Sequence, residues 1–143
     1  MYIGLHNHTA IGSNIRGFLD STNRVEEMVK YAKELGMEGI AITDHDSLTA
    51  HIDLLHYVKA LKEQDEDTWA NFKPICGNEI YLVSRKTIEE DKDYSSFYHF
   101  ILIAKDMVGY QQLGIFRPRL GAKIFLLMLI QELLLILMIC LLN

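Results

Sequence analysis

The apolar positions of the chain alternate between short runs and helical spacing. The largely apolar residues 2–5 predict a first strand, and residues 9–23, rich in Gly, Ser, Asn and Thr, predict a loop. A helix is expected next, with Asn23 as its N-terminal cap and Gly36 as its stop. Its buried face would consist of apolar residues three or four apart: Val25, Met28, Val29, Ala32 and Leu35.

A second strand and helix follow in the same order. Residues 39–43 form an almost continuous apolar run, which is typical of a parallel strand covered on both faces, and residues 49–63 predict the next helix. Such a βαβ unit should be right-handed. The helix would bury one side, made of Ile52, Leu54, Leu55, Val58 and Leu61. Its histidines His51 and His56 are interpreted as packing or surface residues, because neither stands at a strand end.

Two more strands are predicted at residues 74–83 and 98–104, and another helix from Met107 onward. The polar stretches 64–71 and 84–97 predict loops between these elements. Strands alternating with helices indicate an α/β fold, here with about four βα units.

The alternation ends at the boundary between residues 1–113 and residues 114–143, which predicts a domain followed by an apolar tail. Residues 124–142 are almost purely apolar and could form a helix that spans a bilayer. Three cations before this stretch would keep the N-terminal part in the cytoplasm: Arg117, Arg119 and Lys123. The polar pair Gln131 and Glu132 would be costly in lipid, so a membrane-spanning helix is one interpretation of the tail, and a second is given below.

Composition narrows the class of protein. The chain has 143 residues, half of them hydrophobic, which is enough for one domain with a core. The net charge is −5, and since residues 114–143 carry +2, residues 1–113 carry −7. An acidic domain does not suit an autonomous DNA clamp, because phosphate binding needs clustered Lys and Arg. The distant cysteines Cys76 and Cys140 predict reduced thiols and a cytoplasmic protein.

Candidate chemistry begins at His6 and His8. The two residues stand two apart on the predicted first strand, so their side chains share a face while Asn7 faces away. Two imidazoles that converge on one point suit a divalent transition metal. Taken alone, this motif fits two half-exposed strand histidines equally well.

The following strands supply further donors. Asp44 and His45 end the second strand, and Glu79 lies within the third. Functional groups gather at the carboxyl ends of parallel strands, so these side chains should meet His6 and His8. A mixture of imidazoles and carboxylates without cysteine favours a centre with more than one ion over a structural zinc site. Phosphoester hydrolysis is the reaction this indicates, with Asp44 as the candidate catalytic residue.

Four ordered stretches of the chain resemble the polymerase and histidinol phosphatase (PHP) family. They read Leu-His-Asn-His-Thr at 5–9, Ala-Ile-Thr-Asp-His at 41–45, Gly-Asn-Glu-Ile-Tyr at 77–81 and His-Phe-Ile-Leu-Ile-Ala-Lys at 99–105. Residues 104–113, which end in Gly-Tyr-Gln-Gln-Leu, are typical of the polymerase branch, the N-terminal domain of bacterial DNA polymerase III alpha subunits. The resemblance covers residues 2–113 and is specific because the four motifs keep their order.

The resemblance implies a distorted seven-stranded, TIM-like (β/α)7 barrel, of which this chain would hold a partial version. It also implies a site for up to three divalent ions such as Mn, Zn or Fe. The metal ligands implied are His6, His8, Asp20, His45, Glu79 and His99. His99 follows from the resemblance alone, since it begins its strand. The activity implied is a metal-dependent 3′–5′ exonuclease in DNA replication, with a DNA 3′ end and the rest of a polymerase as partners.

The C-terminal part departs from the family pattern. The remaining family ligands, a histidine and an Asp-x-His, would lie beyond residue 113, yet no histidine follows His99. We therefore expect a truncated PHP domain of weak activity and a tail produced by a reading-frame shift, with a membrane anchor as the competing hypothesis. Two other functions stay open: a stand-alone phosphoesterase of the histidinol-phosphatase type, and a non-catalytic metal-binding module.

Overall fold

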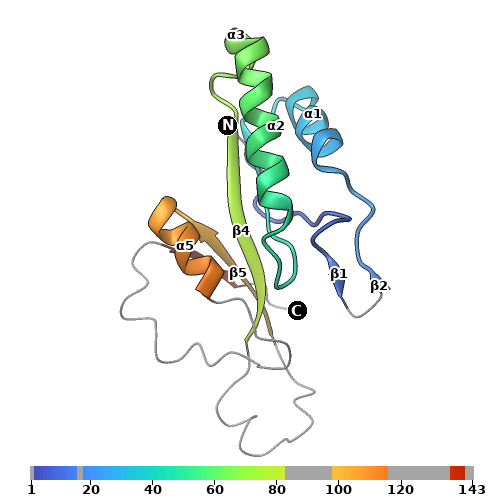
Figure 1. The fold of residues 1–143 in the computed structure, drawn as a ribbon, viewed down its shortest axis with the longest axis vertical. Coiled ribbons are helices and arrows are strands. Elements are labelled where there is room, and N and C mark those ends of the chain that lie inside the picture. The colour runs from blue at the N-terminus through green and yellow to red at the C-terminus, as the bar shows by residue number, and fades with distance from the viewer. Residues whose placement is uncertain (1, 16–17, 83–97, 116–135, 141–143) are drawn as a thin grey trace, which may run out of the picture.

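The computed structural model describes residues 2–15, 18–82, 98–115 and 136–140 of the chain. Helices and strands alternate along much of this part, as Figure 1 shows. The elements are β1 (Asn14–Ile15), β2 (Phe18–Leu19), α1 (Val25–Glu34), β3 (Gly39–Ile42), α2 (Ala50–Gln64), α3 (Glu66–Trp69), β4 (Lys73–Leu82), β5 (Tyr98–Ala104), α5 (Met107–Ile115) and β6 (Ile136–Cys140). The α/β class predicted from the sequence is confirmed.

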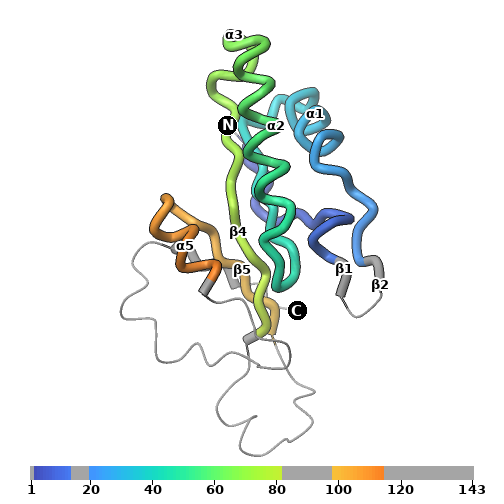
Figure 2. Tube along the Cα trace, viewed as in Figure 1, coloured from blue at the N-terminus to red at the C-terminus, as the bar shows by residue number. Residues whose placement is uncertain are grey.

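A four-stranded mixed sheet in the order β3-β4-β5-β6 organises the fold. β3 and β4 run parallel, whereas β5 pairs antiparallel with both β4 and β6. α2 runs alongside β4 with α1 beside it, and α5 packs near β5; the same path can be followed along the Cα trace in Figure 2. The sequence predicts about four βα units, and β5 departs from that pattern because it runs antiparallel to β4.

The N-terminal segment forms one isolated bridge with this sheet instead of the strand predicted over residues 2–5. Gly4 pairs in parallel with Ile40, and the Ala41 N–H donates to the Gly4 carbonyl at 2.7 Å. The side-chain amide of Asn7 then donates to the carbonyls of Gly4 and Ala41, at 3.2 and 2.9 Å. Asn7 thus replaces ladder bonds with side-chain bonds, so a regular strand does not continue.

Two hydrophobic clusters among the described residues join the helices to the sheet. The first comprises Val25, Val29, Ala32, Ile40, Ile42, Ala50, Leu54, Val58 and Phe72. The second comprises Ile80, Phe100, Leu102 and Leu113. The predicted buried side of α2 is partly wrong, because Ile52 and Leu55 are 59% and 38% exposed while Ala50 and His51 face inward. Apolar residues occupy several sides of this helix, so their spacing alone does not select the buried one.

The predicted loop 9–23 contains a short antiparallel hairpin, β1 with β2. Asn23 is not the cap of α1: Arg24 holds the cap position without a side-chain bond. The Asn23 amide instead donates to the carbonyl of His8 at 3.1 Å, which anchors the segment that carries His8. Gly36 ends the helix as predicted, at φ +73°, a conformation that glycine adopts without steric cost.

The apolar tail contributes a strand to the sheet. β6 pairs antiparallel with β5, so the predicted tail helix is wrong at Ile136–Cys140. Without β6, this edge of β5 would expose unpaired backbone N–H and C=O groups. Pairing with β6 supplies their hydrogen-bond partners. The rest of the predicted tail helix, residues 124–135 and 141–142, lies outside the described residues. Within the described ranges, no helix has the length and apolar character needed to cross a bilayer.

Candidate metal centre

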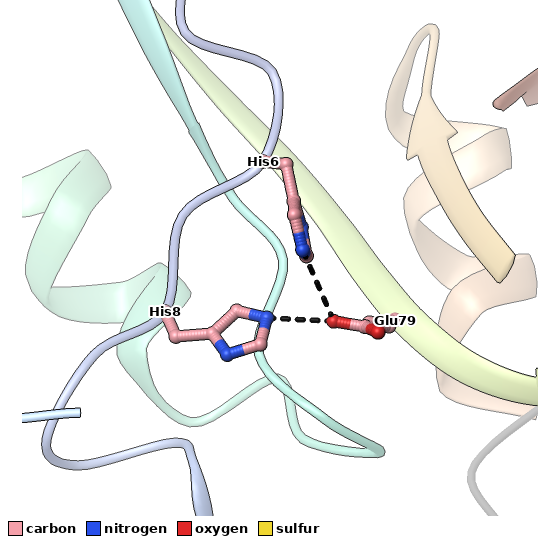
Figure 3. A group of neighbouring side chains, drawn as sticks. All are labelled: His6, His8 and Glu79. Atoms are coloured by element: carbon pink, nitrogen blue, oxygen red, sulfur yellow. Dashed lines mark hydrogen bonds and ion pairs between the residues drawn. The ribbon is translucent and has the colours of Figure 1, made fainter. Parts of the chain in front are cut away.

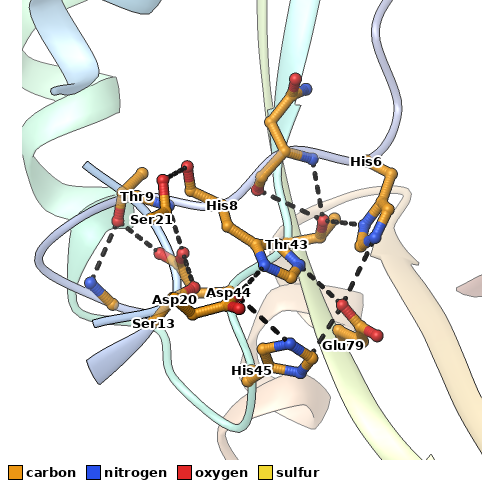
Figure 4. Close-up of polar contacts among 12 residues, drawn as sticks. His6, His8, Thr9, Ser13, Asp20, Ser21, Thr43, Asp44, His45 and Glu79 are labelled. Atoms are coloured by element: carbon orange, nitrogen blue, oxygen red, sulfur yellow. Dashed lines mark hydrogen bonds and ion pairs between the residues drawn. The ribbon is translucent and has the colours of Figure 1, made fainter. Parts of the chain in front are cut away.

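Five backbone segments meet where β3 ends and carry the candidate site, and Figure 4 shows those that bear His6, His8, Asp20, His45 and Glu79. His45 follows β3 and forms a parallel bridge with Glu79 of β4, and the Glu79 N–H donates to the Asp44 carbonyl at 3.1 Å. His99, at the start of β5, stands directly opposite Tyr81 of β4. Because β5 is antiparallel, its beginning lies at the same edge as the end of β3. This direction is the structural reason why His99 belongs to the cluster.

Glu79 lies at the centre of the cluster, with its side chain only 2% exposed. Its Oε2 lies 2.6 Å from Nε2 of His8 and 3.4 Å from Nε2 of His6, the two contacts drawn in Figure 3. The same oxygen lies 3.6 Å from Nδ1 of His45, and Oε1 is hydrogen-bonded to Nδ1 of His99. One carboxylate therefore faces four imidazoles, which come from three separate segments of the chain.

Asp20 forms the outer side of the cluster. Its Oδ2 lies 2.6 Å from Nδ1 of His8 and 3.5 Å from Nε2 of His45. The Ser21 hydroxyl donates to the His8 carbonyl at 2.9 Å, which ties the loop bearing Asp20 to the N-terminal segment. The side chains of Asp20 and His6 are 45% and 36% exposed, so the cluster reaches solvent at both residues.

The imidazole rings pack against one another. Ring centroids are 4.7 Å apart for His6 and His8, 4.4 Å for His8 and His45, and 5.2 Å for His45 and His99. Burial lowers the pKa of both His6 and His45, whereas the hydrogen bond to Glu79 raises the pKa of His8. Burial alone would raise the pKa of Glu79, but the hydrogen bonds with His8 and His99 and the charges of neighbouring imidazoles lower it on balance.

The donor atoms fit divalent metal ions. Three groups each bring three ligand atoms within 4.8 Å of one another: His6, His8 and Glu79; His8, Asp20 and His45; and His45, Glu79 and His99. Imidazole nitrogen and carboxylate oxygen are the ligands that zinc, iron and manganese accept. The groups overlap at His8, His45 and Glu79, so neighbouring ions could share ligands as in multinuclear hydrolytic sites. All six ligands implied by the family resemblance are brought together.

Asp44, the candidate catalytic residue, is placed differently. Its carboxylate is fully buried and accepts from the Thr9 N–H at 2.6 Å, the Thr9 hydroxyl at 2.7 Å and the Ser13 hydroxyl at 2.7 Å. Gly12 passes so close that a Cβ there would lie 1.9 Å from Asp44 Oδ2. Asp44 belongs to none of the three ligand groups found among the described residues. Its contacts indicate that it holds the loop after His8 in place.

Sequence reasoning missed two hydroxyl residues at the cluster. Thr43 Oγ1 lies 2.9 Å from Nδ1 of His6, and the Tyr81 hydroxyl lies 3.3 Å from Nδ1 of His45. Both could have been found from strand periodicity, because Thr43 stands two residues before His45 and Tyr81 two residues after Glu79.

Comparison with known proteins confirms the resemblance seen in the motifs. A family model described as PHP domain matches residues 4–115. Over 118 residues the chain is 46% identical to "Probable DNA polymerase YorL" of Bacillus subtilis, and it is equally similar to "DNA-directed DNA polymerase" of Bacillus phage SPbeta. It is 33% identical over 109 residues to "DNA polymerase III subunit alpha" of Campylobacter jejuni. These matches cover 76–79% of the chain but only 8–9% of the relatives' own length.

A solved structure shares the fold. A Bifidobacterium adolescentis protein assigned as a metal-dependent phosphoesterase superposes with a TM-score of 0.51 at 18% sequence identity. The superposition covers 79% of this chain and 32% of that structure. At this level of identity the likeness supports the fold alone, and it is consistent with part of a TIM-like barrel.

Proposed function

The chain belongs to the PHP domain family, and on that premise we propose that its imidazole–carboxylate cluster is a divalent metal centre that hydrolyses phosphodiesters at DNA 3′ ends. The observation that carries the proposal is the convergence of six side chains into three overlapping groups whose ligand atoms lie within 4.8 Å. Mn, Zn or Fe are the ions that this mixture of donors favours.

Each residue of the centre would have a distinct task. Glu79, buried and facing four imidazoles, would bridge neighbouring ions, while His6 and His99 would complete the two ligand groups that contain it. Asp20 with His8 and His45 would form the third group. When bound, the ions would supply a hydroxide nucleophile and stabilise charge on the phosphoryl oxygens. The substrate would approach where the ligands reach solvent, at Asp20, His6 and His99.

The charge of the domain supports a role for the ions in substrate binding. Residues 1–113 carry −7, so the domain offers no general electrostatic attraction to a phosphate backbone. Divalent ions held at the cluster would reverse the local charge where a phosphate must bind. The relatives named as DNA polymerases favour a DNA 3′ end as substrate and the other parts of a polymerase as partners, in the cytoplasm where bacterial DNA is replicated.

A hydrolysis assay with two substrates tests this function. The full chain is loaded with Mn²⁺ and incubated with single-stranded DNA labelled at its 3′ end and, separately, with p-nitrophenyl phosphate, a phosphate monoester. We expect slow release of 3′ nucleotides that is lost in His8→Ala and retained in His56→Ala, since His56 is an exposed residue of α2.

The other outcomes identify the alternative functions. Hydrolysis of the monoester but not of DNA would overturn the exonuclease proposal in favour of a histidinol-phosphatase-like enzyme. Metal binding without hydrolysis of either substrate would favour a non-catalytic metal-binding module.

A further inference from the structure

The hydroxyl of Thr43 makes three contacts in a buried position. Its Oγ1 lies 2.9 Å from Nδ1 of His6, accepts from the Asn7 N–H at 3.2 Å and donates to the Asn7 carbonyl at 3.4 Å. Thr43 itself is 0% exposed, so no contact with bulk water replaces any of these. His6 and Asn7 thus supply all three of these hydrogen-bond contacts of the hydroxyl.

Counting protons assigns the direction of the bond to His6. A threonine hydroxyl has one proton to donate and two lone pairs to accept with. The proton serves the Asn7 carbonyl and one lone pair receives the Asn7 N–H. With its proton so placed, the hydroxyl meets His6 as an acceptor, and this arrangement, in which Nδ1 of His6 carries a proton, satisfies all three contacts. Neutral His6 then has its free lone pair on Nε2, the atom 3.4 Å from Glu79.

Tyr81 stands in the same relation to His45. The two rings are stacked, with centroids 5.5 Å apart and planes 1° from parallel, and the hydroxyl lies 3.3 Å from Nδ1. The opposite nitrogen of His45, Nε2, faces Asp20 at 3.5 Å. Nδ1 also lies 3.6 Å from Glu79 Oε2, so two oxygens that can accept a proton stand beside Nδ1, whereas one stands beside Nε2.

We propose that Thr43 and Tyr81 are positioning residues that hold His6 and His45 as Nδ1-protonated tautomers, so that both coordinate metal through Nε2. Each hydroxyl accepts the Nδ1–H of one imidazole and fixes the plane of its ring. Partners of this kind on the second ring nitrogen fix the tautomer and the orientation of metal-binding histidines. The inference rests on the proposed metal centre, and it assigns roles to two residues outside the ligand set.

Nitrogen NMR of the zinc-loaded chain tests the tautomers directly. Zn²⁺ is diamagnetic, so ¹⁵N–¹H correlation spectra can identify which nitrogen of each assigned histidine keeps its proton. We expect His6 and His45 to retain Nδ1–H and to lose the free Nε2 signal on zinc binding. Coordination of either histidine through Nδ1 would overturn the assignment for that residue while leaving the metal centre intact.

Zinc titrations of matched variants test the positioning role. We expect Thr43→Val and Tyr81→Phe each to weaken zinc binding by about 10–100-fold, the usual effect of losing such a partner. Thr43→Ser, which keeps the hydroxyl, should bind as the wild type does. The controls Tyr31→Phe and Thr68→Val alter exposed residues of α1 and α3 and should leave the zinc affinity unchanged.

The results separate the two proposals. Unchanged affinity in folded Thr43→Val and Tyr81→Phe, checked by circular dichroism, would overturn the positioning role alone. Failure of the wild-type chain to bind zinc would overturn the metal centre and, with it, this inference.

Discussion

Glu79 Oε2 lies 2.6 Å from Nε2 of His8, on a carboxylate that three further imidazoles surround. Glu79→Gln keeps the shape of this side chain but removes the negative charge that the imidazoles and any bound cation face. We expect Mn²⁺ affinity to fall by more than about 100-fold, beyond the effect typical of an outer partner. Isothermal titration calorimetry measures this loss, and a variant that binds Mn²⁺ within a few-fold of wild type would contradict the central role of Glu79.

Among the ligand groups found in the described residues, His99 belongs to one, with His45 and Glu79. His99→Ala should therefore lower the metal content by one ion while the other two groups continue to bind. Inductively coupled plasma mass spectrometry after dialysis measures the stoichiometry. The control His56→Ala changes an exposed histidine on α2 and should retain the full complement. Equal metal content in the two variants would show that His99 is not a metal ligand.

Asp44→Asn should destabilise the fold. The substitution removes the charge that three buried hydrogen bonds from Thr9 and Ser13 stabilise, and an amide can accept fewer of them. We expect a loss of about 2–3 kcal/mol in the free energy of unfolding, measured with urea. The control Asp53→Asn, on the exposed first turn of α2, should cost less than about 1 kcal/mol. A large fall in hydrolysis rate with unchanged stability would instead support Asp44 as a catalytic residue.

His51 gives stability a dependence on pH. Burial lowers the pKa of His51 from its usual 6.5, outweighing its hydrogen bond to the Ile42 carbonyl at 3.2 Å. As the pH falls below 6.5 the unfolded chain binds a proton before the folded chain does, so the contribution of His51 to stability is complete above pH 6.5 and declines below it.

The difference in unfolding free energy between wild type and His51→Gln isolates this effect, because the other histidines are common to both chains. We expect the difference to be constant above pH 6.5. As the pH falls below this value, the wild type should lose stability relative to His51→Gln. A difference that does not change between pH 7.5 and pH 5 would show that His51 titrates normally in the folded chain.

Much of the centre could be predicted from local spacing. His6 and His8 stand two apart, and His45, just after β3, pairs in parallel with Glu79 of β4, so strand-like spacing indicates that they converge. Asn7 points away from them, as alternation predicts, and its amide binds the backbone instead. These relations depend only on short-range geometry, which the sequence specifies directly.

The role of His99 could not be derived in the same way. The alternation of side chains along a strand is identical in parallel and antiparallel directions, so the apolar pattern of β5 does not reveal that it runs against β4. The side chain of Asp44 is a second example. It stands beside His45 in the sequence, but the hydroxyls and N–H groups of the loop at Thr9 and Ser13 draw its carboxylate away from the cluster.

Anomalous X-ray diffraction from crystals of the full chain grown with Mn²⁺ tests the central claim most directly. Data collected at the manganese absorption edge locate the ions independently of any assumed ligand. We expect anomalous peaks bounded by His6, His8, Glu79 and His99, with at least one peak shared by two of the three ligand groups found among the described residues. An empty cluster in crystals soaked with saturating Mn²⁺, or manganese bound only elsewhere on the chain, would contradict it.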